Sequence, residues 1–523
     1  MITLLDYGAG NVRSVVNAIE SLGETVKVVE RGEDILSAQK LIFPGVGAFG
    51  NMMQILNKKN YVAPLKAYLN ANRPYLGICL GLQALFDGST EAPEVRGLGI
   101  LPGAVERFDI DLAVPHIGWN GLNVKKPSHI FKGLDGNHKF YFVHSYFVVT
   151  EEDSLVLTTT DYGGEFVSSI QKKNITATQF HPEKSGSAGI HLLKNFLETG
   201  AEQAGPVNVT GGTKLAKRII ACLDVRSNDQ GDLVVTKGDQ YDVRENGTVR
   251  NLGKPVELAK RYYMEGADEI TFLNITGFRD FPLQDMPMLE VLRQTSKNVF
   301  VPLTIGGGIK DYTDSNGRSY TALEVATEYF RSGADKISIG SDAVMTVEEY
   351  LKTGRKTGRS SIEEISRVYG NQAVVISVDP RRVYVKSANA VTHQVIETAF
   401  PGPDGERYCW YQCTIQGGRQ GRDLDAITLA QVCEKLGAGE ILLNCIDRDG
   451  TNLGYDLELI NAVKAAVTIP VIASSGAGGV THFYEVFTQT EAEAALAAGI
   501  FHRREVPIAD VKNYLKGKIE VRL

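Results

Sequence analysis

Residues 218–225 read RIIACLDV, a short apolar run that ends in an aspartate and leads into a polar stretch. Seven further runs of this kind follow at regular intervals, and each is followed by a turn and a helix pattern. They are EITFLNIT (269–276), VFVPLTIGGGI (299–309), DKISIGSDAV (335–344), AVVISVDP (373–380), EILLNCIDRDG (440–450), IPVIASSGAG (469–478) and AALAAGIFH (494–502). Eight strand–helix units over about 300 residues predict a (β/α)8 TIM barrel.

The eight runs also contain an internal repeat. The first and fifth runs both carry an aspartate near their end, Asp224 and Asp379, and the third and seventh share a Val-Pro or Ile-Pro step and a glycine-rich end. Self-similarity on this scale favours duplication of a half-barrel over two unrelated domains. Three connections, 225–254, 311–320 and 381–424, are unusually long, which is typical of lids and binding loops.

Residues 1–200 mix short apolar runs with helix-like stretches, for example MITLLDYG (1–8), PYLGICLGL (74–82) and ITATQFHPE (175–183). This alternation predicts a separate α/β domain. The segment that follows is rich in glycine and in small polar residues, as linkers are. We therefore expect a first domain at 1–203, a linker at 204–216 and the barrel at 217–523.

The composition is that of a globular protein, with 523 residues, 43% hydrophobic and 22% charged, and a formal net charge of −7. The acidic balance argues against nonspecific nucleic-acid binding, and no apolar run reaches the roughly 18–20 residues that span a bilayer. The six cysteines form no pair of Cys-x-x-Cys motifs, which indicates a reducing compartment. The nine histidines show no ligand pattern, so we expect neither a metal nor a cofactor.

The motif GICLG places Cys79 between Gly77 and Gly81. A cysteine that only packs in a core needs no glycines beside it. A nucleophile on a tight strand-to-helix turn does need them, because the backbone must bend sharply there. On this motif alone both interpretations stay open.

The motif FHPEKSG supplies a base and a carboxylate to orient it. His181 and Glu183 are two residues apart, so on an extended segment they point to the same side. An imidazole held by a carboxylate can take a thiol proton and return it to a leaving amine. The stretch PGVG offers the backbone N–H groups of Gly45, Val46 and Gly47 for an oxyanion hole.

With these motifs the first half resembles the class-I glutamine amidotransferase family, which has a flavodoxin-like α/β fold. The resemblance implies that Cys79 attacks the side-chain amide of glutamine, that a glutamyl thioester forms and that ammonia leaves. It also implies that Gln83, one helical turn past the nucleophile, contacts bound glutamine. The other notable side chains of this half are interpreted as structural or surface groups (His116, His138, His144) or as a neighbour of the domain interface (Tyr141).

In the barrel, Asp224 and Asp379 end the first and fifth strands, on opposite sides of the mouth. One carboxylate there can simply cap a helix, but two at equivalent positions predict a general acid and a general base that face one substrate. Glycine-rich turns beside helix N-termini bind anions through backbone N–H groups. They predict one phosphate site after strands three and four (Gly307, Gly308, Gly340, Ser341) and a second after strands seven and eight (Ser474, Ser475, Gly476, Ala498, Gly499).

Four further residues are predicted to bind substrate at the mouth. Lys237 lies on the long loop after strand one, Asn274 ends strand two, and Asp449 and Thr451 follow strand six. Cys222, just before Asp224, is expected to pack inward.

Taken together, the motifs IACLDV, GGGIKD, SVDP, IDRDGT and ASSGAG resemble the cyclase of histidine biosynthesis. The whole chain is similar to the eukaryotic fused imidazole glycerol phosphate synthase family, in its plant-like form. The resemblance implies a bisphosphate substrate, PRFAR, which ammonia from glutamine helps to split into imidazole glycerol phosphate and AICAR, with the two aspartates as acid and base. One departure is Ser475, where many single-domain relatives have glycine.

Two other enzymes also fit parts of the pattern. A pyridoxal phosphate synthase joins a glutaminase to a barrel, but it needs Schiff-base lysines where these strand ends carry Asp, Asn and Gly. A sugar isomerase of the same barrel type would leave the glutaminase half without a purpose.

Charged residues occur where barrel strands begin, at the end of the barrel opposite the mouth. Inward charges there are costly unless they are paired, and two of each sign can form a closed ring (Arg218, Glu269, Lys336, Glu440). In the family such a ring gates the entry of ammonia, and ordinary ion pairs at the rim are the alternative. Asp335 and Lys184 are expected to pair across the domain interface.

The resemblance implies small-molecule substrates, no nucleic acid, no membrane and no obligate protein partner, hence a monomer. The C-terminal stretch is most similar to plant forms, which carry a plastid transit peptide. We therefore expect the plastid stroma if such a peptide was trimmed, and otherwise the cytoplasm.

Overall fold

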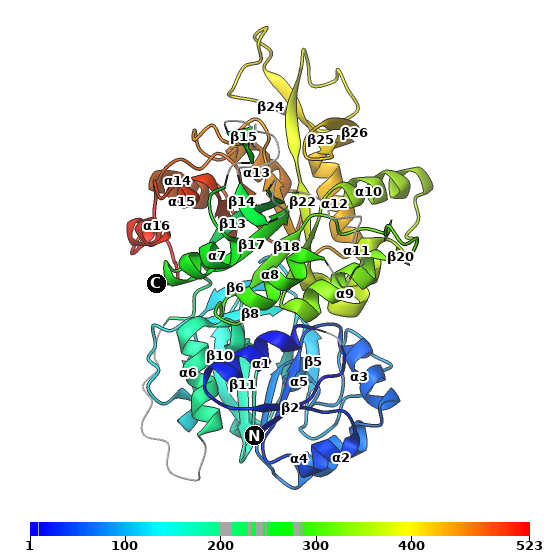
Figure 1. Ribbon diagram of the computed structural model, residues 1–523, viewed down its shortest axis with the longest axis vertical. Helices are drawn as coiled ribbons and strands as arrows, with labels where there is room; N and C mark the ends of the chain where they lie inside the picture. The colour runs from blue at the N-terminus through cyan, green and yellow to red at the C-terminus, as the bar shows by residue number, and fades with distance from the viewer. Residues whose placement is uncertain are drawn as a thin grey trace.

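The computed structural model describes residues 1–8, 10–198, 212–228, 232–236, 244–245, 248–249, 251–275, 283 and 286–523. Lys237 and most of the expected linker lie outside the described residues. Figure 1 shows two domains, with the N-terminal domain below, the barrel above it and a long antiparallel sheet at the top of the barrel.

The N-terminal domain is built on a mixed sheet with the strand order β2-β1-β3-β4-β12-β11-β10-β7. Its first five strands run parallel, and the rest pair antiparallel. The strands are β1 (Ile2–Leu4), β2 (Val26–Val28), β3 (Leu41–Gly45), β4 (Tyr75–Cys79), β5 (Ala104–Arg107), β7 (Asn123–Val124), β9 (Tyr146–Val149), β10 (Val156–Asp161), β11 (Glu165–Lys172) and β12 (Ile175–Thr178), with β6 (His116–Asn120) and β8 (Phe140–His144) paired as a separate hairpin. The helices are α1 (Val12–Ser21), α2 (Gly32–Ser37), α3 (Phe49–Lys58), α4 (Val62–Asn70), α5 (Leu80–Gln83) and α6 (Gly186–Leu197).

The second domain is a closed parallel barrel. Its strands are β13 (Arg218–Ser227), β17 (Glu269–Asn274), β18 (Leu303–Gly306), β21 (Lys336–Ile339), β22 (Val374–Val378), β27 (Glu440–Asn444), β28 (Val471–Ser474) and β29 (Ala494–Ala497). Pairing of β13 with β29 closes the ring. The helices are α7 (Pro255–Met264), α8 (Pro287–Thr295), α9 (Ala322–Ser332), α10 (Ser341–Thr353), α11 (Ser361–Tyr369), α12 (Ala426–Leu436), α13 (Leu457–Lys464), α14 (Val480–Gln489), α15 (Gly499–His502) and α16 (Ile508–Leu515). The predicted fold classes of both halves are confirmed.

The long connections carry secondary structure of their own. After β13 the chain turns back as β14 (Leu233–Thr236), and two short strands, β15 (Arg244–Glu245) and β16 (Thr248–Val249), follow. The connection at 311–320 holds a hairpin of β19 (Tyr312–Thr313) and β20 (Ser319–Tyr320). The connection at 381–424 is a four-stranded antiparallel sheet: β23 (Pro380–Val385), β24 (Val395–Glu397), β25 (Tyr408–Ile415) and β26 (Gln420–Asp425). It projects from the mouth end of the barrel (Figure 1).

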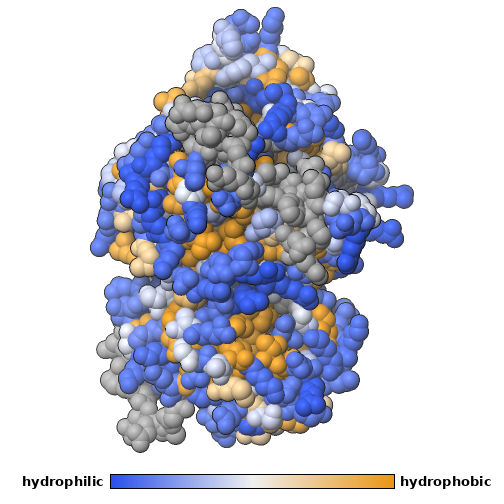
Figure 2. Space-filling view, viewed as in Figure 1, coloured by the Kyte–Doolittle hydropathy of each residue, from blue (hydrophilic) through white to orange (hydrophobic). Residues whose placement is uncertain are grey.

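The amino ends of the barrel strands face the N-terminal domain. Asn11 Nδ2 donates to the Gly333 carbonyl at 2.9 Å, and Trp119 Nε1 donates to the Asp268 carbonyl at 3.1 Å. On the face seen in Figure 2, hydrophilic side chains cover the line where the two domains meet. The end of the barrel that faces the first domain is therefore the end opposite the mouth.

Candidate active sites

Cys79 lies at the sharp turn between β4 and α5, with φ 53° and ψ −103°. This backbone conformation is strained for a residue with a side chain. The flanking glycines are required by close packing: a Cβ on Gly81 would lie 2.0 Å from the Phe43 carbonyl oxygen, and one on Gly77 would lie 2.5 Å from the Gly81 carbonyl oxygen. The strain and the glycines together are those of a nucleophile elbow.

The predicted base and carboxylate are in contact. His181 Nδ1 lies 2.8 Å from Glu183 Oε1, and both side chains are buried. The sequence predicts an extended segment here, and this is wrong for Glu183, which lies in a 3-10 turn at Pro182–Lys184. The pair forms because His181 is itself extended and the turn that begins at Pro182 brings the carboxylate back to the ring.

Opposing effects act on the pKa of His181. Burial alone would lower the pKa of the imidazole, but the Glu183 carboxylate and the adjacent Cys79 group raise it to about 10. A base that is held by a carboxylate and close to a thiol has the arrangement needed to move a proton to and from sulfur.

Gln83 and Gln179 form a short chain of contacts beside the thiol. Gln83 Nε2 donates to Gln179 Oε1 and to the Tyr146 carbonyl, both at 3.1 Å. Gln179 Nε2 in turn lies 3.4 Å from Cys79 Sγ. Sequence reasoning missed Gln179, although its position two residues before His181 in TQFHPE could have indicated it.

Glu91 is a second residue that sequence reasoning missed. It accepts a hydrogen bond from the Phe49 N–H at 2.7 Å. Burial raises the pKa of its carboxyl. Burial also raises the pKa of Tyr146, and the charge of Glu91 adds to that rise. A partly buried carboxylate near the chain of glutamines is a candidate for binding the ammonium group of an amino-acid substrate.

The two buried histidines of the β6–β8 hairpin are structural. His116 Nδ1 lies 3.1 Å from His144 Nε2, and the His116 ring stacks on Tyr162 at a centroid distance of 4.0 Å. Burial lowers the pKa of both rings. His138 lies at the surface, 2.9 Å from Asp135.

The PGVG loop packs against the barrel. The Tyr7 hydroxyl donates to the Val46 carbonyl at 2.7 Å. Gly47 has φ +141°, and a Cβ there would lie 3.0 Å from the carbonyl oxygen of Val368, at the end of α11. Gly45 ends β3, where a Cβ would lie 2.5 Å from the Leu80 Cβ. Residues of both domains therefore fix the orientation of this loop.

A small cavity lies between the two domains. Val46, Tyr141, His181 and Lys184 line it from the first domain, and Lys336 lines it from the barrel. Tyr141 thus lies at the interface.

A salt bridge crosses the interface beside this cavity. Lys184 Nζ lies 2.6 Å from Asp335 Oδ2. The predicted partners are therefore in contact.

The four charged residues at the barrel's lower end form a closed ring. Arg218 contacts Glu269 (Nη1 to Oε2, 3.0 Å) and Glu440. Lys336 Nζ lies 2.6 Å from Glu269 Oε1 and 2.7 Å from Glu440 Oε2. All four side chains are at most 1% exposed. Because each charge has two partners of opposite sign, the desolvation cost of the ring is offset by ion pairs on both sides.

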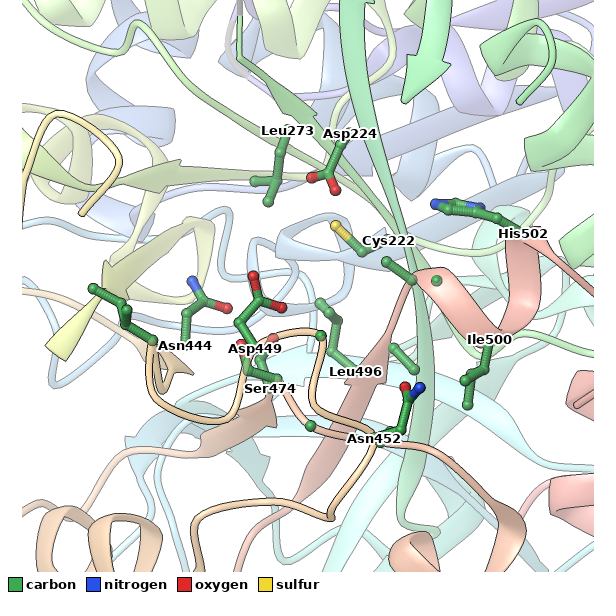
Figure 3. A pocket seen from close by; sticks show the side chains of 18 of the residues that line it. Cys222, Asp224, Leu273, Asn444, Asp449, Asn452, Ser474, Leu496, Ile500 and His502 are labelled. Atoms are coloured by element: carbon green, nitrogen blue, oxygen red, sulfur yellow. The ribbon is translucent and has the colours of Figure 1, made fainter. Parts of the chain in front are cut away.

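The mouth of the barrel holds a cavity of about 650 Å³. Asp224, Asp379 and Asp449 line it, and Figure 3 shows the carboxylates of Asp224 and Asp449 directed into the same space. Burial raises the pKa of Asp379, although Asn444 Nδ2 donates to its Oδ1 at 2.8 Å. A raised pKa suits a carboxyl that gives and takes protons near neutral pH. Cys222 also lines the cavity and is buried, as expected for an inward residue.

The second predicted phosphate site lies on the wall of this cavity. Its lining includes Ser474, Ser475, Gly476, Ala498 and Gly499. Ser475 has φ +72°, a conformation that favours glycine. A Cβ on Gly476 would lie 2.2 Å from the Gly454 carbonyl oxygen.

The first predicted phosphate site is placed differently. Gly307, Gly308, Gly340 and Ser341 follow β18 and β21 at the same end of the barrel. They are not among the described residues that line the cavity. A Cβ on Gly307 would lie 2.1 Å from the Asn274 carbonyl oxygen, so the glycine is required for packing between β17 and β18.

Two predicted substrate contacts point elsewhere. The Asn274 side chain interacts with the Tyr329 hydroxyl, while its neighbours Leu273 and Ile275 line the cavity. Thr451 Oγ1 donates to the Arg448 carbonyl at 2.8 Å and is exposed. Alternation along β17 therefore turns Asn274 away from the cavity, and the Thr451 side chain closes its own turn; substrate binding by these two residues stays a prediction.

Over the described part of the chain, no helix is long and apolar enough to cross a membrane. No group of three or more His, Cys, Asp or Glu side chains in the same part is placed to hold a metal ion.

Comparison with known proteins matches each half to a family. Residues 3–199 match the glutamine amidotransferase class-I family, and residues 218–507 match the histidine biosynthesis protein family. The chloroplastic imidazole glycerol phosphate synthase hisHF of Arabidopsis thaliana is 60% identical over 531 residues, an alignment that covers 100% of this chain and 90% of the relative. The hisHF protein of Schizosaccharomyces pombe is 56% identical and covers 98% of each chain. The HisF subunit of Methanosphaera stadtmanae is 42% identical over 58% of this chain and 97% of its own length.

Proposed function

The chain belongs to the bifunctional imidazole glycerol phosphate synthase family, and from this premise we propose how its two sites share one reaction. The enzyme hydrolyses glutamine to glutamate and ammonia in the first domain. It uses that ammonia in the barrel to convert PRFAR to imidazole glycerol phosphate and AICAR, a step of histidine biosynthesis.

In the first domain, we assign the nucleophile to Cys79. Its sulfur attacks the side-chain amide carbon of glutamine as a thiolate, since His181, whose pKa Glu183 raises, already holds the proton. The tetrahedral intermediate collapses to a glutamyl thioester, and His181 gives the proton to the leaving ammonia. Water then hydrolyses the thioester to glutamate. We assign the stabilisation of the oxyanion to the backbone N–H groups of the loop Gly45–Gly47.

Gln83 and Glu91 are assigned to the binding of the substrate glutamine. Gln83 already lies in a chain of hydrogen bonds that ends at the Cys79 thiol. Glu91 offers a partly buried carboxylate to the α-ammonium group.

Ammonia passes from one site to the other inside the protein. His181 and Lys336 both line the interdomain cavity. This connection is the observation that carries the proposal, because it joins the glutaminase site to the closed ring under the barrel. We infer that the ring Arg218–Glu269–Lys336–Glu440 is the gate. Its ion pairs must rearrange for ammonia to enter the barrel.

In the barrel, Asp224 and Asp379 act as the general acid and general base on PRFAR. Asp449 shares their cavity and completes a set of three carboxyl groups. The backbone at Ser474–Gly476 and at Ala498–Gly499 binds one phosphate group of the substrate. The second phosphate is assigned to the turns that carry Gly307, Gly308, Gly340 and Ser341, at the same end of the barrel.

Two variants and two nitrogen sources test this division of labour. Cys79→Ala should abolish turnover with glutamine and keep turnover with an added ammonium salt. Asp379→Asn should abolish turnover of PRFAR with either source and keep glutamate release from glutamine. Steady-state rates of glutamate release and of PRFAR consumption decide the matter. Glutamate release by Cys79→Ala at the wild-type rate would overturn the assignment of the nucleophile.

We further propose that the boundaries 1–203, 204–216 and 217–523 delimit glutaminase, linker and cyclase. A fused chain needs no separate glutaminase subunit, which supports a monomer. The chloroplastic location of the Arabidopsis thaliana relative supports the plastid as the site of action. Sedimentation of the purified protein and imaging of a fluorescent fusion made from the native precursor test these two points.

A further inference from the structure

A buried ionic cluster lies beside the barrel mouth, and its members are not among the described residues that line the cavity. The Arg382 guanidinium, on β23, contacts Asp456 from Nε to Oδ2 at 3.1 Å and from Nη2 to Oδ1 and Oδ2 at 2.9 and 2.8 Å. Its Nη2 also lies 3.1 Å from Glu458 Oε2. The side chains of Arg382 and Asp456 are 5% and 1% exposed. Burying such charges is costly, so each needs several partners.

The cluster reaches the turn that carries Asp449. The Arg382 backbone N–H donates to Asp447 Oδ2 at 2.7 Å. In the same turn, the Ile446 backbone N–H donates to the Pro380 carbonyl at 3.0 Å. Pro380 directly follows Asp379. The strand end that carries Asp379 and the turn that carries Asp449 are thus bonded to each other.

Asp456 joins three further elements to the same cluster. It accepts hydrogen bonds from the Leu459 N–H at the start of α13 (3.1 Å) and from the Tyr411 hydroxyl on β25 (2.9 Å). Its Oδ2 lies 3.3 Å from the Cys445 thiol, where the turn begins. One carboxylate therefore contacts the helix after the turn, the inserted sheet and the turn itself.

Phe400, in the inserted segment, lies between two arginines. The guanidinium carbon of Arg382 is 5.0 Å from its ring centroid, and that of Arg448 is 4.6 Å away. Arg448 directly precedes Asp449. The Phe400 N–H donates to Thr398 Oγ1 at 3.0 Å, which fixes the residue to its own strand end. Cation–π attraction of this kind holds the ring against both guanidinium groups.

We propose that Arg382, Asp456 and Phe400 form a brace that positions Asp449 relative to Asp379. The inserted sheet then serves the cyclase by holding two carboxyl groups at the separation the substrate needs, and none of the three brace residues touches the substrate. This inference rests on the proposed function of the barrel mouth.

The test compares three variants with the wild type. Phe400→Leu removes both ring contacts from a residue that is 47% exposed, so it leaves the core intact. Arg382→Lys keeps the charge and loses the planar fork. Arg407→Lys is the matched control, because Arg407 pairs with Glu397 in the same insertion while 72% exposed. The measurements are kcat and KM for PRFAR with an ammonium salt, glutamate release without PRFAR, and the thermal midpoint.

We expect Phe400→Leu and Arg382→Lys to lower kcat about tenfold or more, with KM within about twofold because substrate contacts remain. Glutamate release should stay unchanged in both variants, and the thermal midpoint should stay unchanged in Phe400→Leu. Every value for Arg407→Lys should equal that of the wild type. A fourth variant, Arg448→Lys, should not add to the effect of Phe400→Leu, since Phe400→Leu already removes the ring contact that Arg448 makes. Wild-type kcat in Phe400→Leu overturns the brace. So does a parallel fall in kcat, glutamate release and thermal midpoint. A wild type that converts no PRFAR overturns the proposed function, and the brace with it.

Discussion

The ammonium group of Lys184 lies 2.6 Å from the carboxylate of Asp335, across the boundary between the two domains. Lys184 follows Glu183, the partner of His181, and Asp335 precedes Lys336 of the charged ring. One ion pair therefore links the segment of the proposed glutaminase site to the segment of the proposed gate.

Lys184→Met should uncouple the two sites. The pair is largely buried, and removal of Lys184 leaves the Asp335 carboxylate with hydrogen bonds from Asn11 Nδ2 and the Leu303 N–H but without its ion-pair partner, at a cost in stability of up to about 3–5 kcal/mol. Turnover with glutamine should fall about tenfold, while turnover with ammonium salt stays within about twofold. Parallel assays with the two nitrogen sources measure this. Restoration by Lys184→Met combined with Asp335→Asn would show that the lone carboxylate causes the defect, whereas equal losses with both nitrogen sources would contradict the coupling.

Lys336→Met should open the charged ring. Lys336 lies between Glu269 and Glu440, at 2.6 and 2.7 Å, so its loss leaves two buried carboxylates facing each other. Less ammonia should reach the barrel mouth, so turnover of PRFAR with glutamine should fall while turnover with ammonium salt stays unchanged. A fall in the ratio of PRFAR consumed to glutamate released measures the ammonia that is lost before it reaches the barrel. An equal loss with either source would rule out a gate.

Tyr7→Phe should disturb the oxyanion loop. The Tyr7 hydroxyl donates to the Val46 carbonyl, and an acceptor left without its partner costs about 1–3 kcal/mol. We expect kcat for glutamate release to fall about tenfold with little change in KM, because the oxyanion exists only after attack. Tyr68→Phe is the control, since Tyr68 makes an equal bond of 2.7 Å to the Pro74 carbonyl in the same domain. If the two variants behave alike, the effect of Tyr7 is on stability alone.

Glu183→Gln should change how stability depends on pH. The Glu183 carboxylate is the main reason that the pKa of His181 is raised to about 10. A raised pKa contributes stability that is fully present below the unfolded value of about 6.5 and is lost as pH rises through the folded value. The thermal midpoint of the variant should therefore lie further below that of the wild type at pH 6 than at pH 10. A constant difference would show that Glu183 does not set the charge of His181.

Substitutions at Ser475 should show whether its backbone or its hydroxyl group binds the substrate phosphate. Because φ is +72°, Ser475→Gly should keep the KM for PRFAR within about twofold. Ser475→Val should raise it about tenfold, since a β-branched residue resists this conformation. Steady-state kinetics with ammonium salt measure both. A loss in Ser475→Gly as large as in Ser475→Val would instead assign the binding to the serine hydroxyl.

Much of the molecule was predictable because it depends on local chemistry. The elbow around Cys79 and the pair His181–Glu183 lie within single short motifs, and the strand ends at Asp224 and Asp379 follow from apolar runs and turns. Such motifs fix residue type and spacing, which are visible in one dimension.

Other features were out of reach because they depend on which side of a strand or loop faces which neighbour. Asn274 was expected to face the mouth, but the phase of β17 turns it toward Tyr329. Glu91 carries no motif of its own and became a candidate only through its neighbours, whereas Gln179 lies beside the motif of His181 but is brought to Cys79 by the fold. The insertion at 381–424 was expected to be a loop, yet long-range pairing makes it a sheet.

By itself, the sequence determined the order of the strands and helices and the kinds of side chain at their ends. Only the tertiary structure decided that Arg218, Glu269, Lys336 and Glu440 meet in one ring, that Lys184 reaches Asp335, and that Arg382 braces the turn of Asp449. The physical reason is that local propensity and apolar periodicity act over a few residues. Ion pairs between residues as far apart as Arg218 and Glu440 depend on barrel closure and on the docking of two domains, which no local pattern encodes.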